Sequence, residues 1–129
     1  MADVLVVEDE PMVLMLLEDY LESVGLQVAT AADAVRAMAA LDGPAAHARV
    51  LVTDLNLGPG PDGLAAADEA HRRLPGLRVV YATGNPDLLR GRALPTGDRI
   101  YAKPFDASAL AAEVRAMVDA AAEGSPDPR

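Results

Sequence analysis

The stretch VLVVEDEP, residues 4–11, decides the fold and raises the main question about the site. Its first four residues are all apolar, which is typical of a parallel strand that is covered on both faces. The acids Glu8, Asp9 and Glu10 follow at once. Carboxylates a few Å apart repel each other by about 3 kcal/mol at an effective dielectric constant of about 20. We therefore expect a compensating positive group at the carboxyl end of this strand.

The length and composition indicate one globular domain. The chain has 129 residues, enough for a single core, and it contains no Cys, which excludes disulfides and thiolate metal sites. The net charge of −9 argues against nucleic acid and against an anionic membrane surface as partners. No apolar run nears the roughly 18 residues of a membrane span, and the first residues do not resemble a signal peptide. We expect a cytoplasmic protein with one domain at 1–122 and a disordered polar tail at 123–129.

Apolar runs alternate with helical patterns along the chain. Pro11 suits the first turn of a helix, and Gly25 suits its end. The patterns predict strands at 4–7, 26–30, 49–53, 77–82 and 99–102, and helices at 11–24, 33–41, 62–74 and after Asp106, which can cap the last one. This alternation predicts an α/β fold, a parallel sheet with helices on both faces. In such a sheet the functional crevice lies beyond the carboxyl ends of the strands.

Polar residues follow the strands at this edge. The first strand leads into Glu8 and Asp9, the third into Asp54, the fourth into Thr83 and the fifth into Lys103. If the first and third strands are neighbours, three carboxylates meet in one pocket, with the hydroxyl and the amine at its border. A divalent cation bound among these carboxylates is the candidate for the compensating charge.

These residue types suit a hard divalent cation and a phosphoryl group. Mg²⁺ takes oxygen ligands, and we expect Asp9, Asp54 and the carbonyl of Asn56 to bind it directly, with Glu8 acting through water. An ammonium and a hydroxyl beside a metal-bound carboxylate can hold phosphoryl oxygens. A carboxylate can itself act as the nucleophile and form an acyl phosphate.

The chain resembles the receiver domain of two-component response regulators. The resemblance runs from about residue 3 to 122 and rests on Glu8-Asp9, Asp54, Thr83 and Lys103-Pro104-Phe105, in that order and spacing. It implies a doubly wound, five-stranded parallel sheet of the CheY type in the order 2-1-3-4-5, with two helices on one face and three on the other. It also implies that Asp54 accepts a phosphoryl group from a histidine kinase with Mg²⁺ present, that Thr83 and Lys103 hold the phosphoryl oxygens, and that the Lys103-Pro104 bond is cis. The sequence YATGN, residues 81–85, resembles a subset of stand-alone bacterial receivers with an aromatic-Ala-Thr-Gly signature.

Two features depart from the receiver pattern. Many receivers have an aromatic switch residue three positions before the lysine, but here Ile100 stands there and Tyr101 follows it. Because strand side chains alternate between faces, Tyr101 should point the other way. The segment 84–98 is broken by Pro and Gly, so we expect its helix to be short, one or two turns within 87–92, with raised mobility. The output face is then either remodelled or ordered only on phosphorylation.

Other residues receive ordinary structural interpretations. Glu10 is read as a first-turn acid, and His47 and His71 as solvated surface residues. Gly58, Gly60 and Gly63 are read as a tight loop before the third helix and not as a phosphate-binding loop, because no Lys-Ser/Thr pair follows them. The residues Met12, Met15, Met38 and Met117 are read as packing residues.

The resulting hypothesis is a single-domain response regulator. It would accept a phosphoryl group on Asp54 from a sensor histidine kinase or histidine phosphotransfer protein and signal by contact with a downstream protein that the sequence does not identify. It would catalyse only its own phosphorylation and dephosphorylation. A degenerate receiver that binds proteins without phosphorylation stays open as the alternative. An aspartyl phosphatase is less favoured, because such enzymes typically need an Asp at the position of Asn56.

Overall fold

The computed structural model describes residues 1–57, 62–95 and 97–122. Gly58, Gly60 and the tail 123–129, for which the sequence predicted a loop and disorder, lie outside the described residues. The strands are β1 (Val4–Val7), β2 (Val28–Ala31), β3 (Val50–Thr53), β4 (Arg78–Thr83) and β5 (Arg99–Ala102). The helices are α1 (Pro11–Ser23), α2 (Ala34–Leu41), α3 (Gly63–Arg73) and α4 (Ala107–Ala122), with a 3₁₀ turn, η1, at Pro86–Leu89.

The five strands form one parallel sheet in the order β2-β1-β3-β4-β5, as the resemblance implied. Strand β1 is therefore flanked by β2 and β3, with Val7 in register with Thr53 of β3. The predicted bounds of β1 and β5 are confirmed, but the second strand begins two residues later than predicted. Leu26 belongs instead to the turn that ends α1, because its N–H donates to the carbonyl of Leu21.

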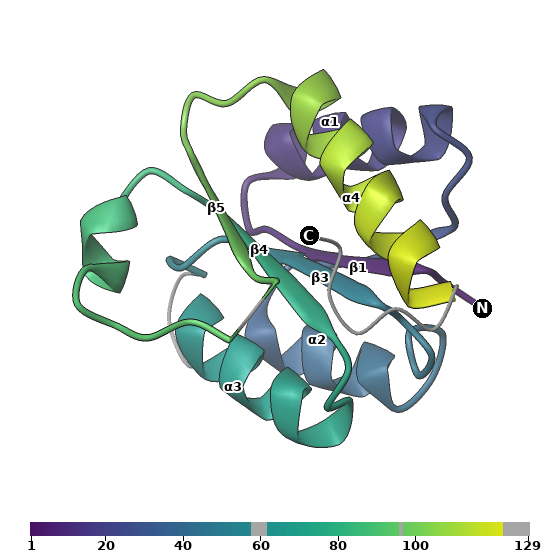
Figure 1. The fold of residues 1–129 in the computed structure, drawn as a ribbon, viewed down its shortest axis with the longest axis horizontal. Helices are drawn as coiled ribbons and strands as arrows, with labels where there is room; N and C mark the ends of the chain where they lie inside the picture. The colour runs from purple at the N-terminus through teal and green to yellow at the C-terminus, as the bar shows by residue number, and fades with distance from the viewer. Residues whose placement is uncertain (58–61, 96, 123–129) are drawn as a thin grey trace.

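The sheet is covered by two helices on each face. Figure 1 shows α1 and α4 on one side of the strands, and α2 and α3 on the other. Successive β1 residues alternate between the two cores: Val4 and Val6 pack with α1 and α4, and Leu5 and Val7 pack with α2 and α3. This two-sided burial explains why the β1 sequence is continuously apolar. Among the described residues, no helix is long and apolar enough to cross a membrane.

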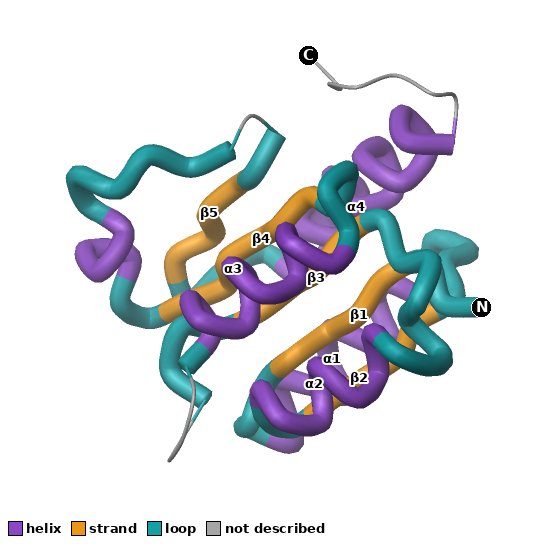
Figure 2. Tube along the Cα trace, turned by 90° about the horizontal axis from the view of Figure 1, so that it is seen from below, coloured by secondary structure: helices purple, strands orange, loops and turns teal. Residues whose placement is uncertain are grey.

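The expectation of three helices on one face is wrong for this chain. Within the described residues there are four α-helices, and the place of the missing one is taken by η1, a single 3₁₀ turn at Pro86–Leu89. Figure 2 shows this turn on the connection beside β5, away from α2 and α3. The prediction of one or two turns within 87–92 is confirmed, although the turn starts one residue earlier and ends before Gly91, whose φ is +75°.

Two readings of side-chain burial were also wrong. Met12 and Met15 are 78% and 61% exposed, although Met38 and Met117 pack in the cores as predicted. The first turns of α1 are apolar all around, so periodicity could not tell the buried stripe from the exposed one. His71 is half-buried against another side chain and is not solvated, whereas His47 is exposed as predicted.

Gly63 allows α3 to begin directly against the end of β3. Its N–H donates to the carbonyl of Leu55 at 2.9 Å, and a Cβ atom at this position would overlap the backbone carbonyl of Asp54. The cap of α3 is Asp62, whose carboxylate accepts the N–H of Ala65 at 2.9 Å. Gly63 therefore sets how closely the helix approaches the strand end that carries Asp54.

We predict that Gly63→Ala destabilises the protein by about 1–3 kcal/mol, because the added methyl group displaces backbone and not a flexible side chain. Urea denaturation measures the change. Gly76→Ala is the matched control, since a Cβ there meets nothing within 4 Å, and it should change the free energy of unfolding by less than about 0.5 kcal/mol. Equal effects of the two substitutions would contradict the steric account.

Candidate functional site

Three carboxylates meet where β1 and β3 end. Glu8 and Asp9 follow β1, and Asp54 follows β3, the strand beside it. One oxygen from each of the three side chains lies within 4.8 Å of the others. Glu8 and Asp54 are buried, at 1% and 7% exposure, whereas Asp9 is exposed. The register of the two strands therefore places three acids in one small pocket, as the sequence predicted.

Lys103 pairs directly with two of these carboxylates, whereas the sequence hypothesis assigned the compensating charge to a metal ion. Its Nζ donates to Glu8 Oε1 and to Asp54 Oδ2, both at 2.9 Å. Its backbone N–H donates to the carbonyl of Thr83 at 2.8 Å, which ties the end of β5 to the end of β4. The following Lys103-Pro104 peptide bond is cis, as the resemblance implied. The ammonium thus holds two buried carboxylates together.

The direct contact between Glu8 and Lys103 was not predicted. The sequence hypothesis gave Glu8 a role through water and placed the lysine at the border of the pocket. In the structure, the extra methylene of Glu relative to Asp helps the carboxylate to reach Lys103 as well as the backbone N–H of Glu10, which donates to Glu8 Oε2 at 3.0 Å. The choice of Glu over Asp at position 8 is the sequence signal for this contact.

The electrostatics of the pocket follow from burial and pairing. Burial raises the pKa of Glu8, although hydrogen bonds from Lys103 and from the Glu10 backbone oppose the rise. Burial lowers the pKa of Lys103, but the hydrogen bonds to Glu8 and Asp54 outweigh it, so the net pKa is raised. The amine therefore stays protonated at neutral pH.

Thr83 ends β4, the strand beside β3, and Asn56 contacts Asp54 through its backbone. Thr83 is fully buried at the end of β4, and its hydroxyl oxygen accepts the N–H of Asn85 at 3.0 Å. The backbone N–H of Asn56 donates to Asp54 Oδ1 at 3.3 Å. One Asp54 oxygen is thus turned to the loop after β3, and the other to Lys103.

The residues present fit a hard divalent cation. The donors are carboxylate oxygens, which Mg²⁺ and Ca²⁺ prefer. Three acids share one ammonium, so the pocket carries a surplus of negative charge that a bound cation would offset. That Asp9, Asp54 and the Asn56 carbonyl would hold the cation directly stays a prediction.

Tyr101 and Ile100 lie on opposite faces of β5, as strand alternation predicted. Tyr101 packs against the core beneath α1 and α4, and its hydroxyl donates to Glu113 Oε1 at 2.6 Å. Ile100 is 43% exposed on the other face. Tyr101 is therefore tied to α4 and does not occupy the position of the usual aromatic switch.

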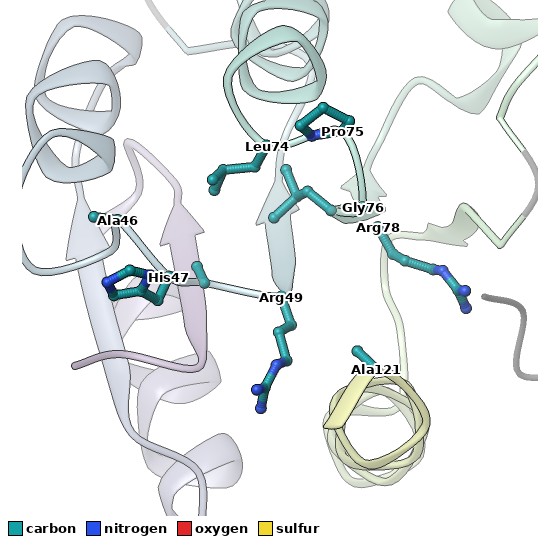
Figure 3. A pocket seen from close by; sticks show the side chains of 10 residues that line it. Ala46, His47, Arg49, Leu74, Pro75, Gly76, Arg78 and Ala121 are labelled. Carbon is teal, nitrogen blue, oxygen red and sulfur yellow. The ribbon is translucent and has the colours of Figure 1, made fainter. Parts of the chain in front are cut away.

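A hollow of about 660 Å³ lies at the opposite end of the strands, away from the carboxylates. Figure 3 shows that its basic side chains diverge: His47, Arg49 and Arg78 point in three different directions. A ligand site needs polar groups that converge. The pocket at the carboxyl ends of β1, β3 and β5 is therefore the better candidate.

Comparisons with known proteins agree with this geometry. The family described as the response regulator receiver domain matches residues 4–115. A response regulator receiver protein from Sinorhizobium medicae WSM419 is similar at 27% identity and a TM-score of 0.80, over 91% of this chain and 94% of that one. The PhyR receiver domain from Erythrobacter litoralis is similar at 30% identity and a TM-score of 0.79, over 92% of this chain and 90% of that one. The NtrX receiver domain from Brucella abortus is similar at 31% identity and a TM-score of 0.72, over 91% of this chain and 98% of that one. None of the curated proteins matches this chain.

We predict that Lys103→Met destabilises the metal-free protein by about 3 kcal/mol, because two buried carboxylates then lack their ammonium partner. Millimolar Mg²⁺ should recover part of this loss by supplying positive charge. Urea denaturation with EDTA and with MgCl₂ measures both effects. Arg36→Met, which removes an exposed ion pair on α2, is the control and should cost less than about 1 kcal/mol. Wild-type stability of Lys103→Met in EDTA would show that the ammonium does not compensate the acids.

Proposed function

Because this chain belongs to the receiver domain family of response regulators, we propose that Asp54 is its phosphoacceptor in two-component signalling. The donor would be the phosphohistidine of a sensor histidine kinase or of a histidine phosphotransfer protein. The reaction would depend on Mg²⁺, and the chain would act in the cytoplasm through phosphorylation-dependent contact with a downstream protein. The contact of Lys103 with both Asp54 and Glu8 is the observation that supports this proposal most.

The proposed step is an in-line displacement at phosphorus. An Asp54 oxygen attacks, a P–O bond forms, and the P–N bond to the donor imidazole breaks with its electron pair left on nitrogen. A bound Mg²⁺ would offset the charge of the transferring group. Lys103 already donates to Asp54 Oδ2, so its ammonium needs only a small movement to contact a phosphoryl oxygen.

Thr83 would respond to the new group. Its hydroxyl now accepts the Asn85 N–H, and on phosphorylation it would donate to a phosphoryl oxygen instead. The aspartyl phosphate carries close to two negative charges where Asp54 carried one. The result would be a shift in the conformation of the residues after β4. Phosphorylation of Asp54 would in this way change the surface that a partner protein contacts.

We predict that Asp54→Asn abolishes acid-labile, Mg²⁺-dependent phosphate uptake from a small-molecule phosphodonor, because the amide is not a nucleophile. Intact-mass spectrometry measures the uptake. Glu10→Gln is the control, since it changes an exposed acid two residues from Glu8 and should leave the uptake unchanged. Undiminished labelling of Asp54→Asn would remove Asp54 from its role. A wild-type chain that takes up no phosphate would favour the degenerate, phosphorylation-independent receiver.

An exposed apolar surface on α1 lies beside this pocket and suits the phosphodonor. It consists of Met12, Met15, Leu16 and Tyr20, all at least 39% exposed. A groove of about 410 Å³ lined by Val13, Leu16 and residues 103–105 continues this surface to the lysine of the pocket. A partner seated here would be next to Asp54, which is where its phosphohistidine must be.

The charge of α1 indicates the chemistry of this partner. The helix carries Glu18, Asp19 and Glu22, and its sequence contains no Lys or Arg. We therefore expect the docking face of the kinase or phosphotransfer protein to be apolar at its centre with basic residues around it.

We predict that Met15→Asp slows phosphotransfer from the cognate kinase by about tenfold or more, the effect of losing about 1.4 kcal/mol of binding. Labelling by a small-molecule phosphodonor should not change, because Asp54 itself is untouched. Val35→Asp is the matched control, an equally exposed apolar residue on α2. Equal slowing by both variants, or no slowing by Met15→Asp, would rule out docking on α1.

A further inference from the structure

The connection between β4 and β5 is a mostly exposed segment of the chain. We call it the strap, and it consists of residues 84–95 with Gly97 and Asp98. Its only regular structure among the described residues is the η1 turn. Figure 1 shows it as a wide loop that projects beyond β5 and returns beside α3. Most of its side chains are exposed, so specific contacts must keep it in place.

One strap residue, Leu89, is buried in the apolar core. Leu89, 4% exposed, belongs to the same apolar cluster as Tyr81 of β4, which is 1% exposed. Burial raises the pKa of Tyr81 to about 12, and the charges of Asp98, Arg92 and Asp68 also act on its hydroxyl. Charges on the strap and on α3 therefore act on a phenol that is buried in the same cluster as Leu89.

Two polar contacts join the strap to α3. The Arg92 guanidinium lies 2.7 Å from an Asp68 oxygen, and Asp98 Oδ2 lies 3.4 Å from His71 Nε2. Asp68 and His71 are three residues apart, so they lie on one face of the helix. The other Asp98 oxygen accepts the N–H of Val79 at 2.9 Å. Asp98 is thus hydrogen-bonded to β4 and lies close to His71 of α3.

We propose that Asp68 and His71 form a latch on α3 that holds the strap closed over Tyr81, and that release of the latch uncovers an apolar surface made of Tyr81 and Leu89. The Arg92–Asp68 pair is about half exposed, and such pairs contribute little, so a change at this pair can weaken the closed state without unfolding the chain. Near the start of the strap, the N–H of Asn85 is bonded to Thr83 Oγ1, so the latch lies at the other end of the segment that follows β4. The latch does not depend on phosphotransfer, and its test uses the unphosphorylated full chain.

Tyrosine nitration reports whether the strap is closed. The chain has three Tyr residues, and tetranitromethane followed by peptide mass spectrometry measures each one separately. Tyr20 is 39% exposed and serves as the reactive internal standard, whereas Tyr81 should be protected in the wild type. Wild-type Tyr81 that reacts as fast as Tyr20 would overturn the proposal.

The decisive variants reverse one charge of the latch and then restore the pair. Asp68→Arg places like charges beside each other, and we expect Tyr81 nitration to rise about tenfold, more than the loss of an exposed pair alone would give. The double variant Asp68→Arg with Arg92→Asp should return the nitration rate of Tyr81 to within about twofold of the wild type. It restores the ion pair with the acid and the base exchanged between the two positions. Protection of Tyr81 in Asp68→Arg, or no restoration in the double variant, would overturn the latch.

Two controls separate local opening from unfolding. Asp119→Arg disrupts a comparable exposed pair with Arg115 on α4 and should leave Tyr81 protected. Tyr101, which is bonded to Glu113 on the other face, should keep its wild-type reactivity in every latch variant. His71→Leu removes the second contact and should also expose Tyr81, with Tyr101 unchanged. A rise in Tyr101 reactivity equal to that of Tyr81 would mean global unfolding and would contradict a local latch.

Discussion

The structure depends on the balance of charge at the carboxyl ends of β1 and β3. Glu8 and Asp54 are buried beside Asp9, and the Lys103 ammonium contacts the first two at 2.9 Å each. A buried carboxylate without a partner costs several kcal/mol, so this arrangement holds only while the lysine or another cation is present. The same surplus of acid makes the pocket suited to a divalent cation and to an incoming phosphoryl group.

The rest of the fold brings these groups together and connects them to the surface. The strand order puts β1 beside β3, Gly63 lets α3 start against the Asp54 carbonyl, and the backbone of Lys103 is bonded to Thr83. Helix α1 offers an apolar surface on one side of the pocket. The strap begins next to Thr83 and ends at the latch on α3. It therefore connects the pocket to a second part of the protein surface, besides α1.

Much of the fold and of the site could be predicted from sequence, because apolar runs mark buried strands and each relevant run ends in a polar residue. Asp54 and Lys103 are such residues, and their meeting follows from the strand order that the receiver resemblance implied. The exposure of Met12 could not be predicted, since α1 begins with an apolar stretch that has no polar face. The burial of His71 depends on Asp98, which is distant in sequence and contacts it only in the folded chain.

The most direct test of the account is a crystal structure of the chain with Mg²⁺ and beryllofluoride, which mimics an aspartyl phosphate. The account predicts the beryllium group on an Asp54 oxygen, the cation between Asp9 and Asp54, and Lys103 Nζ within hydrogen-bond distance of a fluorine. A structure in which beryllofluoride does not bind Asp54, or in which Lys103 stays on Glu8 and makes no contact with the bound group, would contradict it.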